Sequence, residues 1–270
     1  MPAYFWSCGA LTDRGLKRER NEDNYYQDSF WLPQGGEGQE KARAAGPLSG
    51  GVLGVFDGLG GEQAGDFASF CAAKTLDEFR AALKSCRDGD RVKSLVESYI
   101  RQVNAALLQR SGEVGGTVGS TMALLVFRSG TAHVLNLGDS RVYLLRGGKL
   151  SQLSRDHTLA AYLAARGELS AEEARRDPRR NSLTRHLGGR EEDRALSPYC
   201  LPQIRVMPGD RFLLCTDGVH GMLEEGEIAS HLRSARSAAA GAENLVRAAV
   251  AAGGRDNATA LCAFVNFRMF

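Results

Sequence analysis

The stretch VLGVFDGLGGEQAG, Val52–Gly65, joins a short apolar run to an aspartate and a cluster of glycines. The run Val52–Phe56 is typical of a buried β-strand. Asp57 follows it directly, and a charge at the mouth of a core strand raises the cost of folding unless something matches it. The glycines let the backbone bend sharply and come close to whatever Asp57 binds. A nucleotide-binding GxGxxG loop does not fit, because its third glycine is missing and no Gly-Lys-Ser/Thr follows.

Other acidic residues lie beside apolar runs in the same way. They are Glu22 and Asp23, Asp139, Asp217 and Asp256. Alternate strands of an antiparallel sheet begin and end at one rim, so we expect these carboxylates to converge there. Converging carboxylates repel one another unless a cation lies between them. Oxygen ligands without Cys or His clusters favour Mg²⁺ or Mn²⁺, and two such ions sharing Asp57 would hold a hydroxide for attack on phosphorus. The Gly58 carbonyl could complete a coordination shell, since no side chain blocks its approach.

The rest of the chain predicts an α+β domain with helices packed on the outside of antiparallel sheets. Ser129-Gly130 and Gly147-Gly148 are typical of hairpin turns, and Ser170 with Glu173 matches the capping box of a short helix. We interpret Gly35–Gly51 as a surface loop. Further strands are expected at Met122–Phe127, Ala132–Leu137, Val142–Arg146, Phe212–Thr216 and Ala260–Val265. Two long helices are expected around Phe67–Leu83 and Val92–Leu107, and two more after Glu225 and Ala242.

Composition limits the functional classes. The 270 residues are 43% hydrophobic and 24% charged, which is ordinary for a globular protein, and we expect one domain over 1–270. A formal net charge of +2 is too balanced for a dedicated nucleic-acid binder. No run is long enough to span a membrane and no signal peptide is apparent. The six cysteines are scattered without CxxC pairs, which favours reduced thiols in a cytoplasmic protein.

Seven short motifs stand in an order that resembles a known family, the metal-dependent PP2C-like serine/threonine protein phosphatases (PPM family) of bacterial type. The motifs are RERNED (Arg18–Asp23, with Arg18 first), VFDGLGG (Val55–Gly61), GST (Gly119–Thr121), LGDSR (Leu137–Arg141), SRDH (Ser154–His157), TDG (Thr216–Gly218) and GRDNAT (Gly254–Thr259). Each motif alone is weak, but the ordered set is specific and covers Cys8 to Val265. The resemblance implies a β-sandwich of two antiparallel sheets flanked by pairs of antiparallel helices, in four layers (αββα), with two Mn²⁺ or Mg²⁺ ions at one end.

The resemblance also implies a role for individual residues. Asp57 matches the carboxylate that bridges both metals, and Asp217 and Asp256 match ligands of the first ion. The Gly58 carbonyl and Glu22 match ligands of the second ion, with Asp23 as a ligand or water anchor. Asp139, together with Asp217, matches a third-metal position. Arg18 matches the arginine that binds the substrate phosphate, and a guanidinium can grip two phosphate oxygens.

Two positions depart from the family pattern. Leu59 stands where animal members have a histidine that acts as general acid, and Glu62 stands where bacterial relatives often have one. The leaving-group acid is therefore open, with a water molecule of the metal site as one candidate. Residues from about 158 to 187 match the variable flap region. Its arginines could dock acidic phosphopeptides, although a charge run is more often a solvated surface.

Two rival functions deserve comparison. Cys8 and Arg14 have the C-x5-R spacing of cysteine-dependent phosphatases, but the central glycine is missing and Cys8 is expected on a strand. The other rival is a catalytically weak phosphatase-like module that binds a partner or phosphopeptide; against it, every ligand position is filled.

We expect a monomer that dephosphorylates substrates of a bacterial Ser/Thr kinase. Among the histidines, His157 is expected to be structural, and no partner is evident for His133, His186, His220 or His231.

Overall fold

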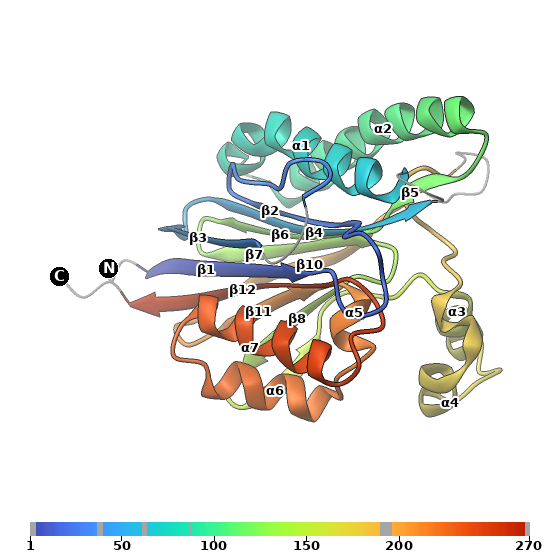
Figure 1. The fold of residues 1–270 in the computed structure, drawn as a ribbon. Helices are drawn as coiled ribbons and strands as arrows, with labels where there is room; N and C mark the ends of the chain where they lie inside the picture. The colour runs from blue at the N-terminus through green and yellow to red at the C-terminus, as the bar shows by residue number, and fades with distance from the viewer. Residues whose placement is uncertain (1–3, 37–39, 61–63, 87, 190–195, 268–270) are drawn as a thin grey trace.

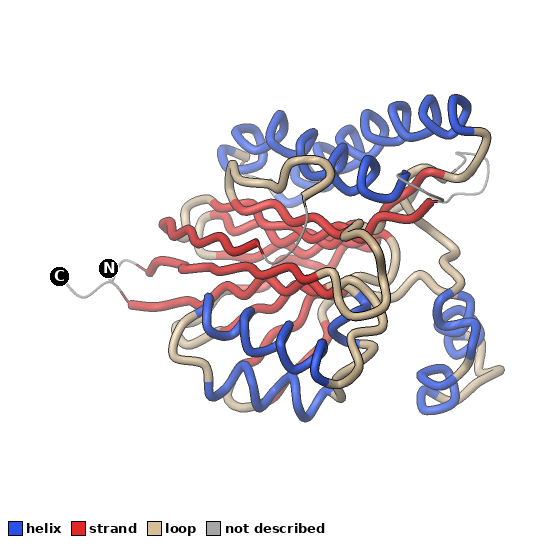
Figure 2. The backbone as a smooth tube through the Cα atoms, viewed as in Figure 1, coloured by secondary structure: helices blue, strands red, loops and turns tan. Residues whose placement is uncertain are grey.

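Two antiparallel sheets lie face to face between two outer layers of helices (Figures 1 and 2). The computed structural model describes residues 4–36, 40–60, 64–86, 88–189 and 196–267. The first sheet has the order β3-β1-β12-β11-β8-β9, and the second has the order β10-β7-β6-β4-β2 with β5 paired to β4. The strands of the first sheet are β1 (Tyr4–Asp13), β3 (Glu40–Pro47), β8 (Arg141–Arg146), β9 (Lys149–Gln152), β11 (Arg211–Cys215) and β12 (Ala258–Phe267). Those of the second are β2 (Asp23–Gln27), β4 (Gly51–Gly60), β5 (Val118–Ser120), β6 (Met122–Arg128), β7 (Thr131–Leu137) and β10 (Tyr199–Arg205).

Three apolar layers hold the molecule together. Between the sheets, Phe127 stacks on Trp6 with ring centroids 6.0 Å apart and meets Phe212 edge-on at 5.4 Å. Helices α1 (Ala64–Ser85) and α2 (Gly89–Val114) cover the outer face of the second sheet. Helices α6 (Glu225–Ser234) and α7 (Ala238–Ala251) cover the first. The predicted four-layer arrangement is confirmed.

Most predicted elements are present, with one clear error. The hairpin β6–β7 turns at Ser129 and Gly130, both with positive φ (49° and 77°), and the Ser170 capping box opens α4 (Ala171–Arg176). The prediction of a loop over Gly35–Gly51 is wrong, because Glu40–Pro47 forms β3 and pairs with β1 along the sheet edge. An edge strand is held by one backbone ladder, so it does not need the apolar alternation that identifies an inner strand.

The segment 158–187, called the flap here after the region of the family that it resembles, leaves and re-enters the sandwich through two adjacent backbone contacts, a narrow neck. At the neck, Thr184 N–H donates to the His157 carbonyl at 2.8 Å, and Leu159 N–H donates to the Ser182 carbonyl at 2.9 Å. The flap contains α3 (Leu159–Ala165), α4 and the 3₁₀ turn η1 (Pro178–Asn181), which lie to one side of the sandwich in Figure 1. In the described ranges, no helix is both long and apolar enough to cross a membrane.

Candidate metal centre and active site

Asp57 lies inside β4, at the point where the strand exchanges one partner for another. Val55 pairs with Ala123 on β6, whereas Gly58 pairs with Ser120 on β5. Thr121, between β5 and β6, closes the junction: its Oγ1 accepts from Asp57 N–H at 3.0 Å, and its N–H donates to the Asp57 carbonyl at 2.8 Å. The same hydroxyl lies 2.6 Å from Ser140 Oγ. The GST motif thus joins the Asp57 strand to the loop that carries Asp139.

The glycines around the site are positions of close backbone approach. A Cβ on Gly58 would lie 2.0 Å from the Gly65 carbonyl oxygen and 2.7 Å from that of Glu22. Gly58 N–H donates to this same Glu22 carbonyl at 3.1 Å. A Cβ on Gly218 would lie 1.9 Å from the Asn257 carbonyl oxygen. Any side chain at these two positions would force apart the segments that carry the acidic residues.

Burial and mutual repulsion hold the pKa values of Asp57, Asp139 and Asp217 high. The pKa of Asp57 is raised well above its usual value by burial and by the charges of Asp23, Asp217, Asp139 and Asp256. Burial, followed by the charge of Asp217, raises the pKa of Asp139 to about 8. Burial, followed by the charge of Asp256, raises the pKa of Asp217 to about 6. The charges of Asp23, Asp139, Asp217 and Asp256 all act on Asp57, whereas the convergence of all five carboxylates on one metal site stays a prediction.

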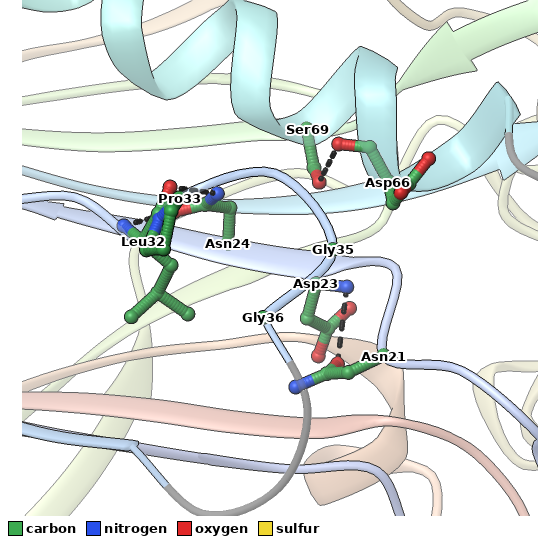
Figure 3. Close-up of a pocket in the computed structure, with 9 residues that line it drawn as sticks. All are labelled: Asn21, Asp23, Asn24, Leu32, Pro33, Gly35, Gly36, Asp66 and Ser69. Carbon is green, nitrogen blue, oxygen red and sulfur yellow. Dashed lines mark hydrogen bonds between the residues drawn. The ribbon is translucent and has the colours of Figure 1, made fainter.

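Two buried carboxylate oxygens lack a hydrogen-bond partner in the described part of the chain: Asp23 Oδ1 and Asp217 Oδ1. The other oxygen of Asp23 is well satisfied, since Oδ2 accepts from the hydroxyls of Thr259 at 2.6 Å and Thr216 at 2.8 Å. Asp23 also lines a pocket of about 10 Å³ with Asp66 and Ser69 (Figure 3), room for about one water molecule.

Unpaired buried oxygens and an all-oxygen donor set fit a hard divalent cation. Across the described residues, however, no three acidic, histidine or cysteine side chains already form a group that could hold a metal.

The RERNED segment is held beside Asp256 by the next residue, Asn257. Asn257 Oδ1 accepts from Glu22 N–H at 2.8 Å, and its Nδ2 donates to the carbonyls of Arg20 and Arg14 at 2.8 and 2.9 Å. Glu22 is half-buried, and burial raises its pKa. Arg18, the residue predicted to bind phosphate, donates to Asp256 Oδ2 at 2.7 Å.

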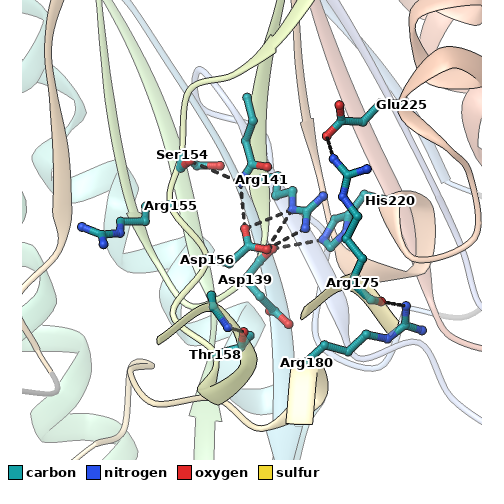
Figure 4. A network of polar contacts seen from close by, with 12 residues as sticks. Asp139, Arg141, Ser154, Arg155, Asp156, Thr158, Arg175, Arg180, His220 and Glu225 are labelled. Atoms are coloured by element: carbon teal, nitrogen blue, oxygen red, sulfur yellow. Dashed lines mark hydrogen bonds and ion pairs between the residues drawn. The ribbon is translucent and has the colours of Figure 1, made fainter. Parts of the chain in front are cut away.

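Asp139 lies in a separate polar network on the flap side of the rim (Figure 4). Arg141 binds Asp156 through Nε and Nη2, the latter at 2.6 Å. His220 Nε2 lies 3.1 Å from the Asp139 carbonyl oxygen. From the flap, Arg175 reaches Glu225 at 3.2 Å. His220, for which the sequence shows no partner, is thus placed against the backbone of Asp139.

The supporting residues Asn257, Thr216, Thr259 and His220 were given no role from the sequence. The first three stand inside or next to the quoted motifs, so their place beside the acidic residues was a usable signal. His220 offers no such signal, since its partner is 81 positions away.

Comparison with known proteins identifies the family. A family model described as protein phosphatase 2C matches residues 39–252. The chain belongs to the protein phosphatase 2C family. It is 31% identical over 255 residues to the serine/threonine phosphatase stp of Listeria innocua, covering 93% of this chain and 92% of that protein. The serine/threonine phosphatase PstP/Ppp of Mycobacterium tuberculosis has a similar structure, with a TM-score of 0.78, 28% identity, and coverage of 97% and 99%. A structure of the PstP catalytic domain contains two manganese ions (TM-score 0.76, 28% identity, coverage 97% and 99%).

Membership of the protein phosphatase 2C family confirms the prediction of a protein-dephosphorylating enzyme of bacterial type and favours it over the binding-module alternative. This family is metal-dependent. The cysteine-phosphatase rival fails on the geometry. Cys8 is buried inside β1, and burial raises its thiol pKa to about 12, so the nucleophilic thiolate is not formed at neutral pH.

Proposed function

We propose that this chain hydrolyses phosphoserine and phosphothreonine in proteins, with two Mn²⁺ or Mg²⁺ ions held at the rim described above. The observation that carries the proposal is the pair of buried, unpartnered oxygens on Asp23 and Asp217 beside Asp57. Leaving such charges unpaired is costly, whereas a divalent cation between them would remove the repulsion. The names of the similar proteins, serine/threonine phosphatases, support the substrate class.

Each acidic residue of the site would hold a particular ion. Asp57 would bridge the two ions, with Asp217 and Asp256 on one and the Gly58 carbonyl and Glu22 on the other; Asp23 would serve as ligand or water anchor. Asp139 and Asp217 would hold a third, weaker ion. When bound, the ions would supply an activated water and neutralise developing negative charge.

The chain's own groups would then orient the phosphate. Arg18 is half exposed, so its guanidinium can turn from Asp256 to two oxygens of an incoming phosphoryl group. Attack by water on phosphorus breaks the bond to the seryl or threonyl oxygen and releases inorganic phosphate and the free hydroxyl. That hydroxyl needs a proton. Leu59 has no proton to give and Glu62 lies outside the described residues, so we assign its delivery to solvent held at the Asp139 carboxylate.

The proposal also includes the cellular role of the enzyme and its compartment. The chain would reverse the action of a Ser/Thr kinase, and phosphoproteomics of a deletion strain would identify its substrates. All six cysteines are free thiols, which fits a reducing compartment such as the cytoplasm.

Metal removal tests the proposal directly. Excess EDTA should abolish release of phosphate from a phosphothreonine peptide, and added Mn²⁺ should restore it. Calorimetry on the stripped protein should show two tightly bound Mn²⁺ ions. Full turnover in EDTA would refute the metal mechanism.

Replacing the bridging carboxylate tests the site. Asp57→Asn should lower the rate by about 10³-fold or more, because the amide cannot neutralise two cations. Calorimetry should show weakened Mn²⁺ binding with the fold retained. Asp90→Asn, an exposed change in the first turn of α2, is the matched control and should be silent. Wild-type kinetics in Asp57→Asn would remove Asp57 from the site.

A further inference from the structure

His220 connects the helical turn that begins with Asp217 to the loop that carries Asp139. It ends α5 (Asp217–His220), a single helical turn that begins with Asp217. Its ring reaches across to the loop after β7, where Nε2 lies 3.1 Å from the Asp139 carbonyl oxygen. A carbonyl can only accept, so Nε2 carries the proton and donates. One hydrogen bond therefore spans from the helix of Asp217 to the backbone of Asp139 (Figure 4).

A second histidine holds the preceding peptide. His157 Nδ1 accepts from Gly138 N–H at 3.1 Å, and His157 N–H donates to the Gly138 carbonyl at 3.0 Å. Gly138 has a φ of 102°, a conformation that side chains disfavour, and a Cβ there would lie 2.8 Å from Thr121 Cβ. The backbone leading into Asp139 is thus fixed from the β6 side and the flap side, and His220 supplies the contact from α5.

We infer that His220 is a positioning residue, which sets the distance between the Asp139 and Asp217 carboxylates and so the affinity for the weakly held third cation. The inference rests on the proposed function. The contact is suited to this task because His220 and Asp217 are three residues apart in one helical turn, and Gly221 N–H closes that turn on the Asp217 carbonyl at 2.7 Å. A shift of the His220 ring would therefore be transmitted to Asp217. Asp156 and Arg141 flank the same ring and restrict its movement.

Two substitutions of similar volume separate this role from simple packing. His220→Leu fills the space but has no donor, whereas His220→Gln places an amide N–H near the position of Nε2. Mn²⁺ binding to each stripped protein should be measured by calorimetry, with hydrogen exchange of residues 138–140 measured in the metal-free state. His231→Leu, on the last turn of α6, is the control.

In His220→Leu, the weak class of Mn²⁺ site should lose about tenfold in affinity, as is usual for residues that orient metal ligands. The tight pair should stay within about twofold of wild type, exchange at 138–140 should accelerate, and His220→Gln should recover most of both properties. If His220→Leu does not fold, His220→Asn, whose shorter side chain withdraws the N–H from the Asp139 carbonyl, takes its place and should show the same loss of weak-site affinity.

Wild-type weak-site affinity in His220→Leu would overturn the inference, as would loss of the tight pair or a failure of His220→Gln to restore the weak site. Absence of any Mn²⁺ binding by the wild-type protein would instead refute the proposed function, so the two failures can be told apart.

Discussion

Under the proposed function, Arg18 would have one partner before turnover and another during it. In the structure its guanidinium donates to Asp256, and 52% of the Arg18 side chain and 33% of the Asp256 side chain are exposed. Solvent screens such a pair, so it contributes little to stability. Asp256 and the neighbouring charges of Glu22 and Asp57 raise the pKa of Arg18. The guanidinium therefore stays charged and can move to a phosphate at small cost.

Arg18→Ala should weaken substrate binding without weakening metal binding. Loss of one charge-assisted contact to the phosphate should cost about 1.5–3 kcal/mol in kcat/KM. The loss should appear mainly in KM, with a smaller change in kcat, when phosphothreonine peptide is titrated. Mn²⁺ affinity should be unchanged or slightly higher, since Asp256 is freed. Lys17→Ala, the exposed neighbour, is the control. An unchanged kcat/KM in Arg18→Ala would show that Arg18 is only a solvated surface charge.

At the scale of the residue, the sequence predicts a candidate site only where neighbouring residues carry the signal. At Asp57 a buried strand, a charged side chain and a glycine bend follow one another within a few positions. The sequence therefore shows that this carboxylate needs a partner. His220 could not be found in this way. Its ring is defined by contact with Asp139, and a hydrogen bond between distant segments leaves no local pattern.

Among the elements, the segment Arg14–Glu22 is held at three backbone groups by a single asparagine. Asn257 precedes β12 by one position, and its three side-chain hydrogen bonds fix the carbonyls of Arg14 and Arg20 and the N–H of Glu22. The segment has no regular secondary structure, so these contacts replace the backbone ladder that a strand would have. The position of Glu22 at the rim follows from them.

Asn257→Asp tests this dependence with little change in shape. The carboxylate keeps the acceptor for Glu22 but loses both N–H donations, and it adds a negative charge near Asp256. We expect unfolding free energy to fall by about 1–3 kcal/mol, measured by urea denaturation. Turnover should also need a higher Mn²⁺ concentration, because Glu22 is less well placed. Asn266→Asp on the exposed end of β12 should change neither property. Equal stability of Asn257→Asp and wild type would show that the segment is held by other contacts.

Helices and strands that show a periodic apolar pattern or a capping pattern could be predicted from the sequence. Strands that are recognised only by their pairing with a neighbouring strand could not. Inner strands such as β6 and β11 are buried along nearly their whole length, so they stand out as apolar runs. β3 and β10 each pair with one neighbour only, and β10 contains Pro202 and a shift in register between Leu201 and Ile204. Edge strands of this kind tolerate proline and irregularity, which removes the signal.

For the whole molecule, the buried His157 gives stability an acid limit. His157 is 7% exposed, and burial, together with the nearby Arg185 and Arg155 charges, lowers its pKa to about 4, with Asp156 acting in the opposite direction. The pKa in the unfolded chain is the ordinary 6.5. Between these values the unfolded chain binds a proton that the folded chain does not, so folding is favoured above pH 6.5 and becomes weaker as pH falls towards 4.

His157→Asn should flatten this dependence. Its Oδ1 can replace Nδ1 as the acceptor for Gly138 N–H, but it does not titrate. Urea denaturation at pH 7.5 and 5.0 should show wild type losing about 2 kcal/mol more than the variant over this range. His231→Asn is the control and should keep the wild-type slope. Parallel slopes for wild type and His157→Asn would mean that His157 titrates normally in the folded protein.

The order of the motifs made the sandwich predictable as a whole, because seven weak patterns in one sequence fit a single topology. The position of the flap against the sandwich was not predictable. It depends on exposed contacts such as Arg175 with Glu225, on side chains that are 59% and 45% exposed, and surface pairs of this kind leave no constraint on sequence.

The narrow neck of the flap has a consequence for how this enzyme could be re-engineered. Since the chain enters at His157 and returns at Thr184 through adjacent backbone bonds, the segment between them is a cassette with a fixed pair of attachment points. Doubling the length of such a closed segment adds only about 0.6 kcal/mol of closure entropy. A flap grafted from a relative could therefore change which phosphoproteins are accepted, while the rim that carries Asp57, Asp217 and Asp256 keeps its own scaffold.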